Sequence, residues 1–264
     1  MAPSLGLIVS TYNWPAALDR MMASVGGQSA IPSELLIADD GSGPETAQVI
    51  ERWRDRLPMS VAHCWQEDDG YRLARVRNLA LARATADYLI FVDGDQILHR
   101  HFVRDHLRAA RRRTVVRGSR AFLSPAWSER ALATGRLPEW WRSGVWRRAA
   151  ALRVPLLSAL LYDWRPRGAE GHNIACWRAD AIAVNGFDER YQGWGGEDGD
   201  FVTRLLHWGA AKRRLRFSGL VYHLDHPAAS RVTQPQNDLL FRETLATRRI
   251  RADWGLDQLS NSNP

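Results

Sequence analysis

Short apolar runs alternate with longer amphipathic segments through the N-terminal part of the chain, and this alternation constrains the fold most strongly. The apolar runs predict strands, and the segments between them, apolar at helical spacing, predict helices. In chain order, we expect strands at 5–10, 34–42, 59–65 and 87–95, and helices at 14–28, 44–56 and 72–86. Near the C-terminal end, the segment 214–224 also predicts a strand. Strands that alternate with helices form βαβ units with a parallel sheet covered on both faces. We therefore predict an α/β fold with a mostly parallel central sheet.

Polar residues follow the predicted strands at the points where the strands end. In parallel sheets, ligands bind beyond the carboxyl ends of the strands. The sequence therefore predicts a binding site at this edge of the sheet. Its candidate residues are Thr11, Asn13, Asp39, Asp40, Asp93 and Asp95.

The D-G-D segment at 93–95 has the composition of a site for a divalent cation. Its aspartates offer hard oxygen ligands for Mg²⁺ or Mn²⁺, and Gly94 leaves room for a phosphate group. Such an ion would neutralise charge on a departing nucleotide diphosphate. His223 or His226 would supply a further ligand, and an imidazole beside carboxylates favours Mn²⁺ over Ca²⁺. The sequence leaves the choice between the two histidines open.

The segment YQGWGGEDGDF, residues 191–201, concentrates glycines and carboxylates. One interpretation is a tight turn before a helix, because acidic residues are favoured in a first helical turn. The other is a functional loop, since neighbouring carboxylates repel one another unless something uses them. On the predicted helix 72–86, Arg75, Arg77 and Asn78 could likewise reach a base or phosphate, or form a solvated face.

The net charge of +7 is carried by arginine, since Lys212 is the only lysine. Eight arginines between Arg100 and Arg120 face one acid, Asp105. This stretch could bind anionic lipid headgroups, phosphorylated glycans or nucleic acid, or it could be a solvated helix face. We expect no nucleic-acid partner, because the strand-end carboxylates would repel phosphate unless a metal intervened.

Several common signals are absent from the sequence. No G-x-G-x-x-G follows the first predicted strand and no Walker sequence is present, which argues against the usual dinucleotide and P-loop sites. Cys64 and Cys176 give no disulfide framework, which suits a reducing compartment. We find no signal peptide and no apolar stretch of roughly 18 residues, so we expect a cytoplasmic protein.

Four segments, STYN (10–13), DDGS (39–42), RVRNLALA (75–82) and FVDGD (91–95), resemble the GT-A fold glycosyltransferases of family 2. Residues 171–201 resemble the C-terminal module of β-1,4-galactosyltransferases and of related bacterial chondroitin-type and lipopolysaccharide transferases. The resemblance covers 4–120 and 171–226, and it implies a Rossmann-like GT-A fold. It divides a single domain, 1–264, into a nucleotide-binding half (4–120), a Trp/Arg-rich helical insert (121–170), an acceptor and catalytic half (171–226) and a helical tail (227–264).

The resemblance also implies a role for each matching residue. Asp198 would be the catalytic base, Asp95 with Asp93 would bind Mn²⁺ (or Mg²⁺), and His223 would be the metal-binding histidine with His226 in reserve. The nucleotide would contact Thr11, Asn13, Asp39, Asp40, Arg75, Arg77, Asn78 and Asp93. The sugar or acceptor would contact Asn173, Trp194, Gly195, Gly196 and Glu197. One departure is EDGD at 197–200, where the galactosyltransferases have three consecutive acids, so acceptor contacts are expected to differ.

These roles imply an inverting, metal-dependent glycosyltransferase. It would move a hexose or N-acetylhexosamine, with galactose-type sugars favoured, from a UDP-sugar to a glycan or lipid-linked saccharide in bacterial surface polysaccharide or lipopolysaccharide synthesis. The alternatives are a sugar-nucleotide nucleotidyltransferase and a non-catalytic sugar-binding or nucleic-acid-binding module. The insert would form either an amphipathic surface for peripheral contact with the anionic inner face of the cytoplasmic membrane or a helical subdomain on the acceptor side.

Overall fold

A seven-stranded sheet forms the centre of the computed structural model, which describes residues 3–139, 144–147, 152–154 and 172–260. Across the sheet the order is β10-β6-β9-β4-β1-β2-β3. The strands are β1 (Leu5–Thr11), β2 (Glu34–Asp39), β3 (Ser60–Trp65), β4 (Tyr88–Asp93), β6 (Thr114–Arg117), β9 (Ile174–Trp177) and β10 (Ala211–Arg214). Each neighbouring pair is parallel except those that contain β9, which runs antiparallel to β4 and β6. The predicted α/β fold with a mostly parallel sheet is confirmed.

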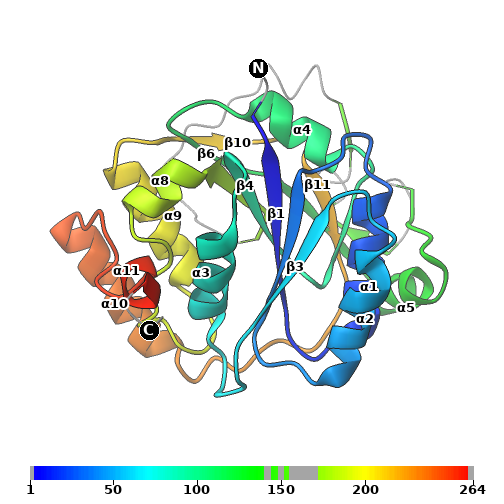
Figure 1. Cartoon of the computed structure of the whole chain (residues 1–264), viewed down its shortest axis with the longest axis horizontal. Coiled ribbons are helices and arrows are strands. Elements are labelled where there is room, and N and C mark those ends of the chain that lie inside the picture. Colours follow the sequence, from blue (N-terminus) through cyan, green and yellow to red (C-terminus); the bar gives the residue numbers. More distant parts are fainter. Residues whose placement is uncertain (1–2, 140–143, 148–151, 155–171, 261–264) are drawn as a thin grey trace.

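Helices cover both faces of this sheet (Figure 1). Buried residues of α1 (Pro15–Gly26), α2 (Pro44–Arg54) and α4 (Phe102–Ala109) share one apolar cluster with the strands. Those of α3 (Leu73–Arg83), α8 (Arg178–Ala183) and α9 (Glu197–His207) share the other. A proline occupies the first turn of α1 and of α2, where its missing N–H costs no helical hydrogen bond.

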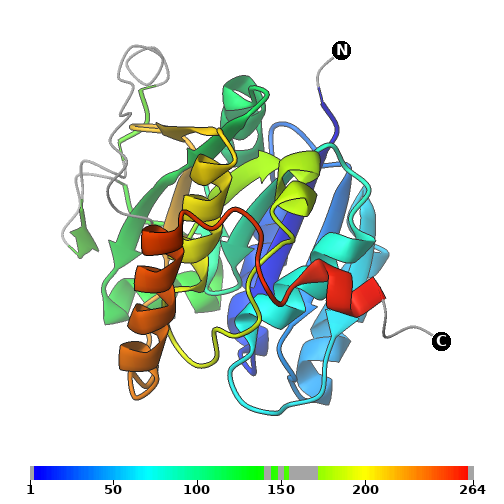
Figure 2. The same ribbon diagram turned by 90° about the vertical axis from the view of Figure 1, so that its left-hand side faces the viewer.

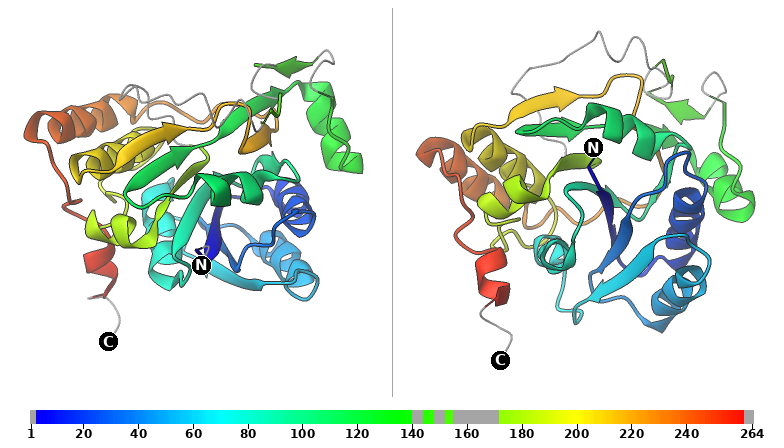
Figure 3. Two further views of the ribbon diagram at one scale, coloured as in Figure 1. Left: turned by 90° about the horizontal axis from the view of Figure 1, so that it is seen from above. Right: turned by 45° about the horizontal axis from the view of Figure 1, so that its top comes forward.

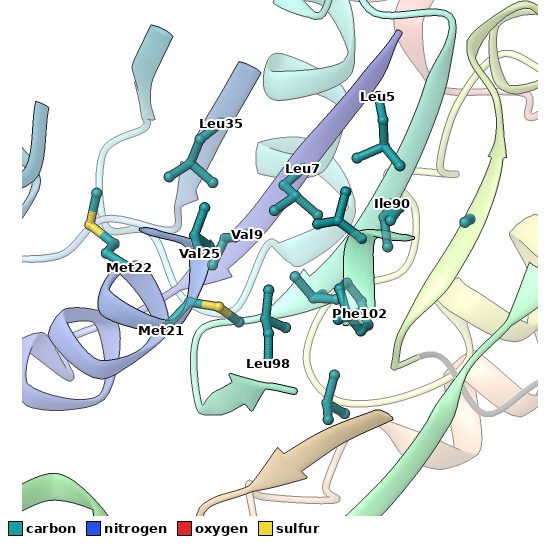
Figure 4. Close-up of a cluster of buried hydrophobic side chains, with 14 of the residues drawn as sticks. Leu5, Leu7, Val9, Met21, Met22, Val25, Leu35, Ile90, Leu98 and Phe102 are labelled. Atoms are coloured by element: carbon teal, nitrogen blue, oxygen red, sulfur yellow. The ribbon is translucent and has the colours of Figure 1, made fainter. Parts of the chain in front are cut away.

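The strand β1 shows how the sequence divides the core. Successive side chains of a strand point to opposite faces, so Leu7 and Val9 enter the first cluster while Ile8 enters the second. Figure 4 shows the first cluster, where Leu7 and Val9 lie with Met21 and Phe102. Burial on both faces explains why β1 reads as a continuous apolar run.

A second, smaller sheet lies beside the first, with the order β5-β11-β7-β8. Its strands are β5 (Gln96–Leu98), β7 (Ser119–Leu123), β8 (Val145–Trp146) and β11 (Leu220–His223). The helix α5 (Pro125–Thr134) packs on it through Ala131. Segments distant in sequence meet in both sheets, and Figure 3 shows yellow β10 beside green β6.

Two predicted strands have different limits in the structure. The strand predicted at 214–224 is divided into β10 and β11, because Phe217 (φ 57°) and Gly219 (φ 57°) turn the chain from one sheet to the other. The strand predicted at 87–95 ends at Asp93, and β5 begins at Gln96 in the second sheet.

The C-terminal tail predicted at 227–264 contains two helices in its described part. They are α10 (Gln234–Thr247), which packs on α9, and α11 (Leu256–Ser260), which packs on α3 (Figure 2). Nearly half of the predicted insert, 140–143, 148–151 and 155–170, lies outside the described residues, and its described part contains α5 and the strand β8. Within the described ranges, no helix is long and apolar enough to cross a membrane.

Candidate active site

A cleft of about 1100 Å³ opens beyond the carboxyl ends of β1 and β4. It lies at the edge of the sheet where the strand-end residues predict a ligand site. The residues singled out in the sequence that line it are Thr11, Asp40, Arg77, Asp93, Asp95, Trp194, Gly195, Gly196, Glu197, Asp198, His223 and His226.

One group in the cleft, here called the base-side cluster, consists of Arg77, Asp93, Glu197 and Asp198. Arg77 is only 1% exposed, and its Nη1 donates to Oδ1 of Asp198 at 2.7 Å. Its Nη2 donates to Oδ1 of Asp93 at 3.0 Å, and Oε1 of Glu197 lies 3.7 Å from Nη1. One buried guanidinium from α3 therefore holds carboxylates that come from β4 and α9.

The first turn of α9 supplies two of these carboxylates. Gly196 precedes the helix at φ 100°, and a Cβ there would lie 2.7 Å from the ring of Tyr191, so the position requires glycine. The acids Glu197 and Asp198 line the cleft, whereas Asp200 is fully buried and binds Nε of Arg204 at 2.7 Å. The helix-start interpretation and the functional-loop interpretation of residues 191–201 therefore describe the same segment.

Burial changes the acidity of the base-side cluster. It raises the pKa of Asp198 well above the usual value for a carboxyl group, while the positive charge of Arg77 opposes this shift. Burial also raises the pKa of Asp93 to about 6, again against the effect of Arg77. The Asp198 side chain is 14% exposed, so a ligand in the cleft can reach it.

A second group, here called the metal-side cluster, consists of Asp95, His223 and His226. One possible ligand atom from each residue lies within 4.8 Å of the others. Oδ2 of Asp95 is 3.0 Å from Nε2 of His226 and 3.4 Å from Nε2 of His223. The register of β11 on β5, which pairs His223 with Gln96, places this histidine beside Asp95. The structure thus brings both candidate histidines to the same carboxylate, and Asp93 lies outside this group.

The donor set of the metal-side cluster fits a divalent transition metal. Oδ1 of Asp95 is buried and accepts no hydrogen bond from the residues that the structure describes, so this oxygen has unused capacity. A carboxylate with two imidazoles suits Mn²⁺ better than Ca²⁺. A side-chain hydrogen bond to Asp95 raises the pKa of His226 to about 9, and burial lowers the pKa of His223. A proton on His226 therefore compensates the charge of Asp95 in the metal-free protein.

The glycine of the D-G-D segment lines the cleft and also makes a close contact with β1. A Cβ on Gly94 would lie 2.9 Å from the carbonyl oxygen of Ser10, and the Gly94 N–H donates to that same oxygen at 2.6 Å. The turn after β4 thus packs directly on the backbone of β1. Its glycine permits this close approach, which separates the contacts of Asp93 from those of Asp95.

Two predicted nucleotide-binding residues hold a turn and do not line the cleft. Oδ1 of Asp39 accepts from the N–H of Ser42 at 2.9 Å, and its Oδ2 lies 2.8 Å from Nε2 of His63. Oδ1 of Asn13 accepts from the N–H of Gly43 at 2.9 Å. Their polar atoms are used in the loop that follows β2.

Three more predicted site residues lie away from the cleft. Asn78 is buried and exchanges hydrogen bonds with the backbone N–H and C=O of Phe187 at 2.8 and 2.9 Å. Asn173 is buried too, with Oδ1 2.9 Å from Nε2 of His106 and Nδ2 donating to the C=O of Gly219 at 2.7 Å. Both amides join distant segments. Arg75 lines a separate, smaller cavity.

The cleft also contains residues that the sequence analysis missed, most of them aromatic or basic. Arg231 places its guanidinium carbon 4.8 Å from the ring centroid of Trp194. A signal existed for Tyr12 and Trp14, which directly follow the end of the first predicted strand, and Arg120 ends the arginine-rich stretch noted in the sequence. The missed lining residues include Tyr12, Trp14, Tyr71, Phe122, Trp146, His172, Arg231, Phe241 and Leu245.

A mostly parallel α/β sheet whose strand-end cleft gathers a carboxylate–histidine group and a buried acid defines a glycosyltransferase of the GT-A type. Residues 7–157 match the family model described as glycosyl transferase family 2. Residues 157–227 match a model described as the N-terminal domain of galactosyltransferase. The chain belongs to glycosyl transferase family 2. This membership favours a glycosyltransferase over the nucleotidyltransferase and binding-module alternatives.

Among characterised proteins, the chain is 30% identical over 221 residues to validoxylamine A glucosyltransferase of Streptomyces hygroscopicus subsp. limoneus. That match covers 77% of this chain and 48% of the relative. It is 26% identical over 255 residues to chondroitin synthase of Pasteurella multocida (strain Pm70), covering 87% of this chain and 25% of the relative. The chain thus spans half or less of the length of these relatives.

Solved structures support the same fold. A mannosyltransferase from Pyrobaculum calidifontis, in complex with GDP-Man and Mn²⁺, superposes with a TM-score of 0.63 at 19% identity, covering 96% of this chain and 66% of that one. S. aureus TarS 1-349, in complex with UDP, superposes with a TM-score of 0.64 at 18% identity, covering 97% and 68%. At these identities the likeness establishes the GT-A fold.

Proposed function

We propose that this chain is an inverting, metal-dependent glycosyltransferase that uses a UDP-sugar. One observation carries the proposal: Asp198 and the metal-side cluster line the same cleft, and they are connected through the turn at 93–95 and Arg77. An inverting transfer needs one base for the acceptor and one electrophilic group for the leaving diphosphate. The cleft has a candidate for each.

Asp198 is the proposed base. It would take the proton from an acceptor hydroxyl as the oxygen attacks the anomeric carbon from the side opposite UDP. Its raised pKa makes the carboxylate a stronger base than an exposed aspartate would be. Arg77 holds its Oδ1, which fixes the orientation of the carboxylate before the acceptor arrives. Trp194 and Glu197 would contact the sugars that flank the reacting bond.

The metal-side cluster is the proposed site of Mn²⁺ or Mg²⁺. Such an ion, when bound, neutralises the charge that develops on the UDP leaving group. Asp95, His223 and His226 would hold it, and the unpartnered Oδ1 of Asp95 supports this assignment. Asp93, held by Arg77, would face the nucleotide sugar.

Thr11 and Asp40 are the proposed uridine contacts, because both line the cleft beyond the ends of β1 and β2. Asp40 is already oriented, since its Oδ2 accepts from the N–H of Arg72 at 2.9 Å. The UDP complex of TarS supports UDP by analogy, whereas the mannosyltransferase complex contains GDP-Man. The identity of the nucleotide is therefore the first property to test.

The acceptor is proposed to be a saccharide or a lipid-linked saccharide in surface polysaccharide or lipopolysaccharide synthesis. Relatives named chondroitin synthase and poly(ribitol-phosphate) beta-N-acetylglucosaminyltransferase support a polymer product. The match to a galactosyltransferase model favours a galactose-type sugar. Peripheral contact with an anionic membrane stays part of this proposal and would involve the 121–170 segment.

The test is a thermal-denaturation series with UDP, GDP, CMP and dTDP, each with Mn²⁺ and with a chelator. A ligand present at a hundred times its dissociation constant stabilises the fold by about 2.7 kcal/mol. We expect this stabilisation for UDP with Mn²⁺ and its loss with the chelator. Equal stabilisation by UDP in the presence of the chelator would refute the metal role, and no response to any nucleotide would refute the donor site.

A further inference from the structure

A second cavity, of about 360 Å³, lies beside the cleft and has no part in the proposed transfer reaction. Its walls come from the start of α3, the loop before α9 and the segment that leads into α11. Arg75, one of the residues singled out in the sequence, lines this cavity and not the cleft.

The cavity and the cleft share a wall. Tyr71 lines the cleft and Arg72 the cavity, while Trp194 lines the cleft and Gln192 the cavity. The two loop segments of this wall are joined by a hydrogen bond, in which the N–H of Gly193 donates to the C=O of Tyr71 at 2.9 Å. Residues two apart have Cα atoms within about 7 Å of each other, so a chain-like ligand in the cleft needs little length to reach the cavity.

Trp254 gives the cavity an aromatic wall. The residue is 57% exposed, which is high for a tryptophan, and its C=O accepts from the N–H of Glu189 at 2.8 Å. The backbone is thus anchored while the indole stays accessible. An indole presents a large apolar face at low entropic cost, which suits the C–H face of a sugar ring.

The polar groups of the cavity are already paired within the protein. Nη1 of Arg75 donates to Oε1 of Gln66 at 3.0 Å, and Nη2 of Arg190 donates to Oδ2 of Asp188 at 2.6 Å. Oε1 of Glu189 accepts from Nδ2 of Asn78 at 2.9 Å. These bonds compensate the charges and fix the planes of the side chains. Such a wall suits an uncharged ligand that offers many hydroxyl groups.

Gln192 adds an exposed polar side chain to the cavity wall. Together with the exposed Trp254, it gives the mixture of one aromatic face and several oriented polar groups that suits a sugar.

We propose that this second cavity is a saccharide subsite, which holds a sugar unit of the acceptor away from the reacting hydroxyl. The assignment rests on the proposed function insofar as the ligand is taken to be the acceptor of that reaction. It makes the enzyme favour an acceptor of several sugar units over a single sugar, because only the longer one reaches both the cleft and the cavity.

The test is a glycan microarray that displays mono- to hexasaccharides, probed with the labelled wild-type chain and with Trp254→Ala. We expect oligosaccharide binding that Trp254→Ala weakens roughly fivefold to tenfold, since an aromatic contact has about that value. The matched control is Trp208→Ala, because Trp208 is also partly exposed (36%) but lies at the far end of α9. A second variant, Gln192→Ala, changes an exposed residue of the same wall.

The outcomes separate this proposal from the one above. Loss of glycan binding in Trp254→Ala and Gln192→Ala, with the UDP and Mn²⁺ response intact, supports the subsite. Glycan binding equal in Trp254→Ala and Trp208→Ala overturns it, as does the absence of binding to every saccharide on the array. Glycan binding that depends on Trp254 in a protein that no nucleotide stabilises would support the subsite and refute the donor site.

Discussion

The base-side and metal-side clusters lie in one cleft, yet they balance their charges in opposite ways. In the base-side cluster three carboxylates share one arginine that is 1% exposed, so the protein itself supplies a cation that offsets part of their charge. In the metal-side cluster one carboxylate meets two imidazoles, and one of its oxygens has no partner. The first group is therefore assembled before any ligand binds, and the second has capacity for a cation from outside.

Removing the proposed base should have the largest effect. Asp198→Asn keeps the shape of the side chain but cannot accept the proton, so we expect the transfer rate to fall by roughly 10²- to 10⁴-fold. UDP affinity, measured by titration calorimetry, should change little. The control is Asp225→Asn, an exposed carboxylate of the same cleft. If Asp198→Asn lost UDP affinity as strongly as it lost transfer rate, Asp198 would belong to the donor site.

Removing the cation of the base-side cluster should destabilise the fold itself. Arg77→Met leaves buried carboxylates without their partner, which should cost about 4 kcal/mol of unfolding free energy. Urea denaturation measures this loss. Arg54→Met breaks the exposed pair with Glu51 and should cost less than about 1 kcal/mol. Similar costs for both variants would contradict a charge balance that depends on Arg77.

Substitutions in the metal-side cluster should lower the affinity for Mn²⁺ and change the free energy of unfolding little. We expect His223→Ala and His226→Ala each to weaken Mn²⁺ binding by roughly tenfold to a hundredfold, because each removes a donor atom beside Asp95. Electron paramagnetic resonance of free Mn²⁺ gives the affinity. His207→Ala is the control, since its Nδ1 bonds the C=O of Arg249. A variant that keeps wild-type affinity identifies a histidine that is not a ligand.

The remaining effect concerns the support beneath the metal-side cluster and develops only on acidification. Burial lowers the pKa of His106 to about 4, and this neutral ring bonds Asn173, which in turn binds the turn before β11. When the pH is below about 6.5, the usual pKa of histidine in an unfolded chain, the unfolded state binds a proton at His106 and the folded state does not. Stability should therefore fall by about 1.4 kcal/mol for each pH unit between 6.5 and 4 because of this group.

The measurement compares wild type with His106→Gln by thermal denaturation across that pH range. The variant should show a smaller loss of stability on acidification, whatever its stability at neutral pH. Because the same carboxylates titrate in both proteins, the difference between their pH slopes isolates His106. Identical slopes would contradict the conclusion that His106 stays neutral in the folded protein.

The sequence predicts several cleft residues that directly follow a strand. Thr11, Asp40, Asp93 and Asp95 line the cleft, because the carboxyl ends of neighbouring parallel strands meet at one edge of the sheet. Family resemblance added the first turn of α9, including Asp198. The chemical roles of these cleft residues stay predictions.

Two predicted residues that lie away from the cleft, Asn78 and Asn173, share a physical cause, which is that their partners lie far away in sequence. Asn78 binds Phe187, and Asn173 binds Gly219, so each amide looks available until the fold is known. The division of the 214–224 strand has the same origin. Its two parts join different sheets, and apolar patterning cannot reveal which neighbours a strand will pair with.

The pairing of β11 with β5 also links metal binding to the quality of folding. His223 lies opposite Gln96 and Tyr222 opposite Ile97, and a slip of one residue would turn the histidine to the other face of the sheet. Under the metal role proposed above, a chain folded with that misalignment would lack a ligand. The fraction of a refolded preparation that binds Mn²⁺ would then count the correctly aligned molecules, so the metal could serve as an assay of refolding yield.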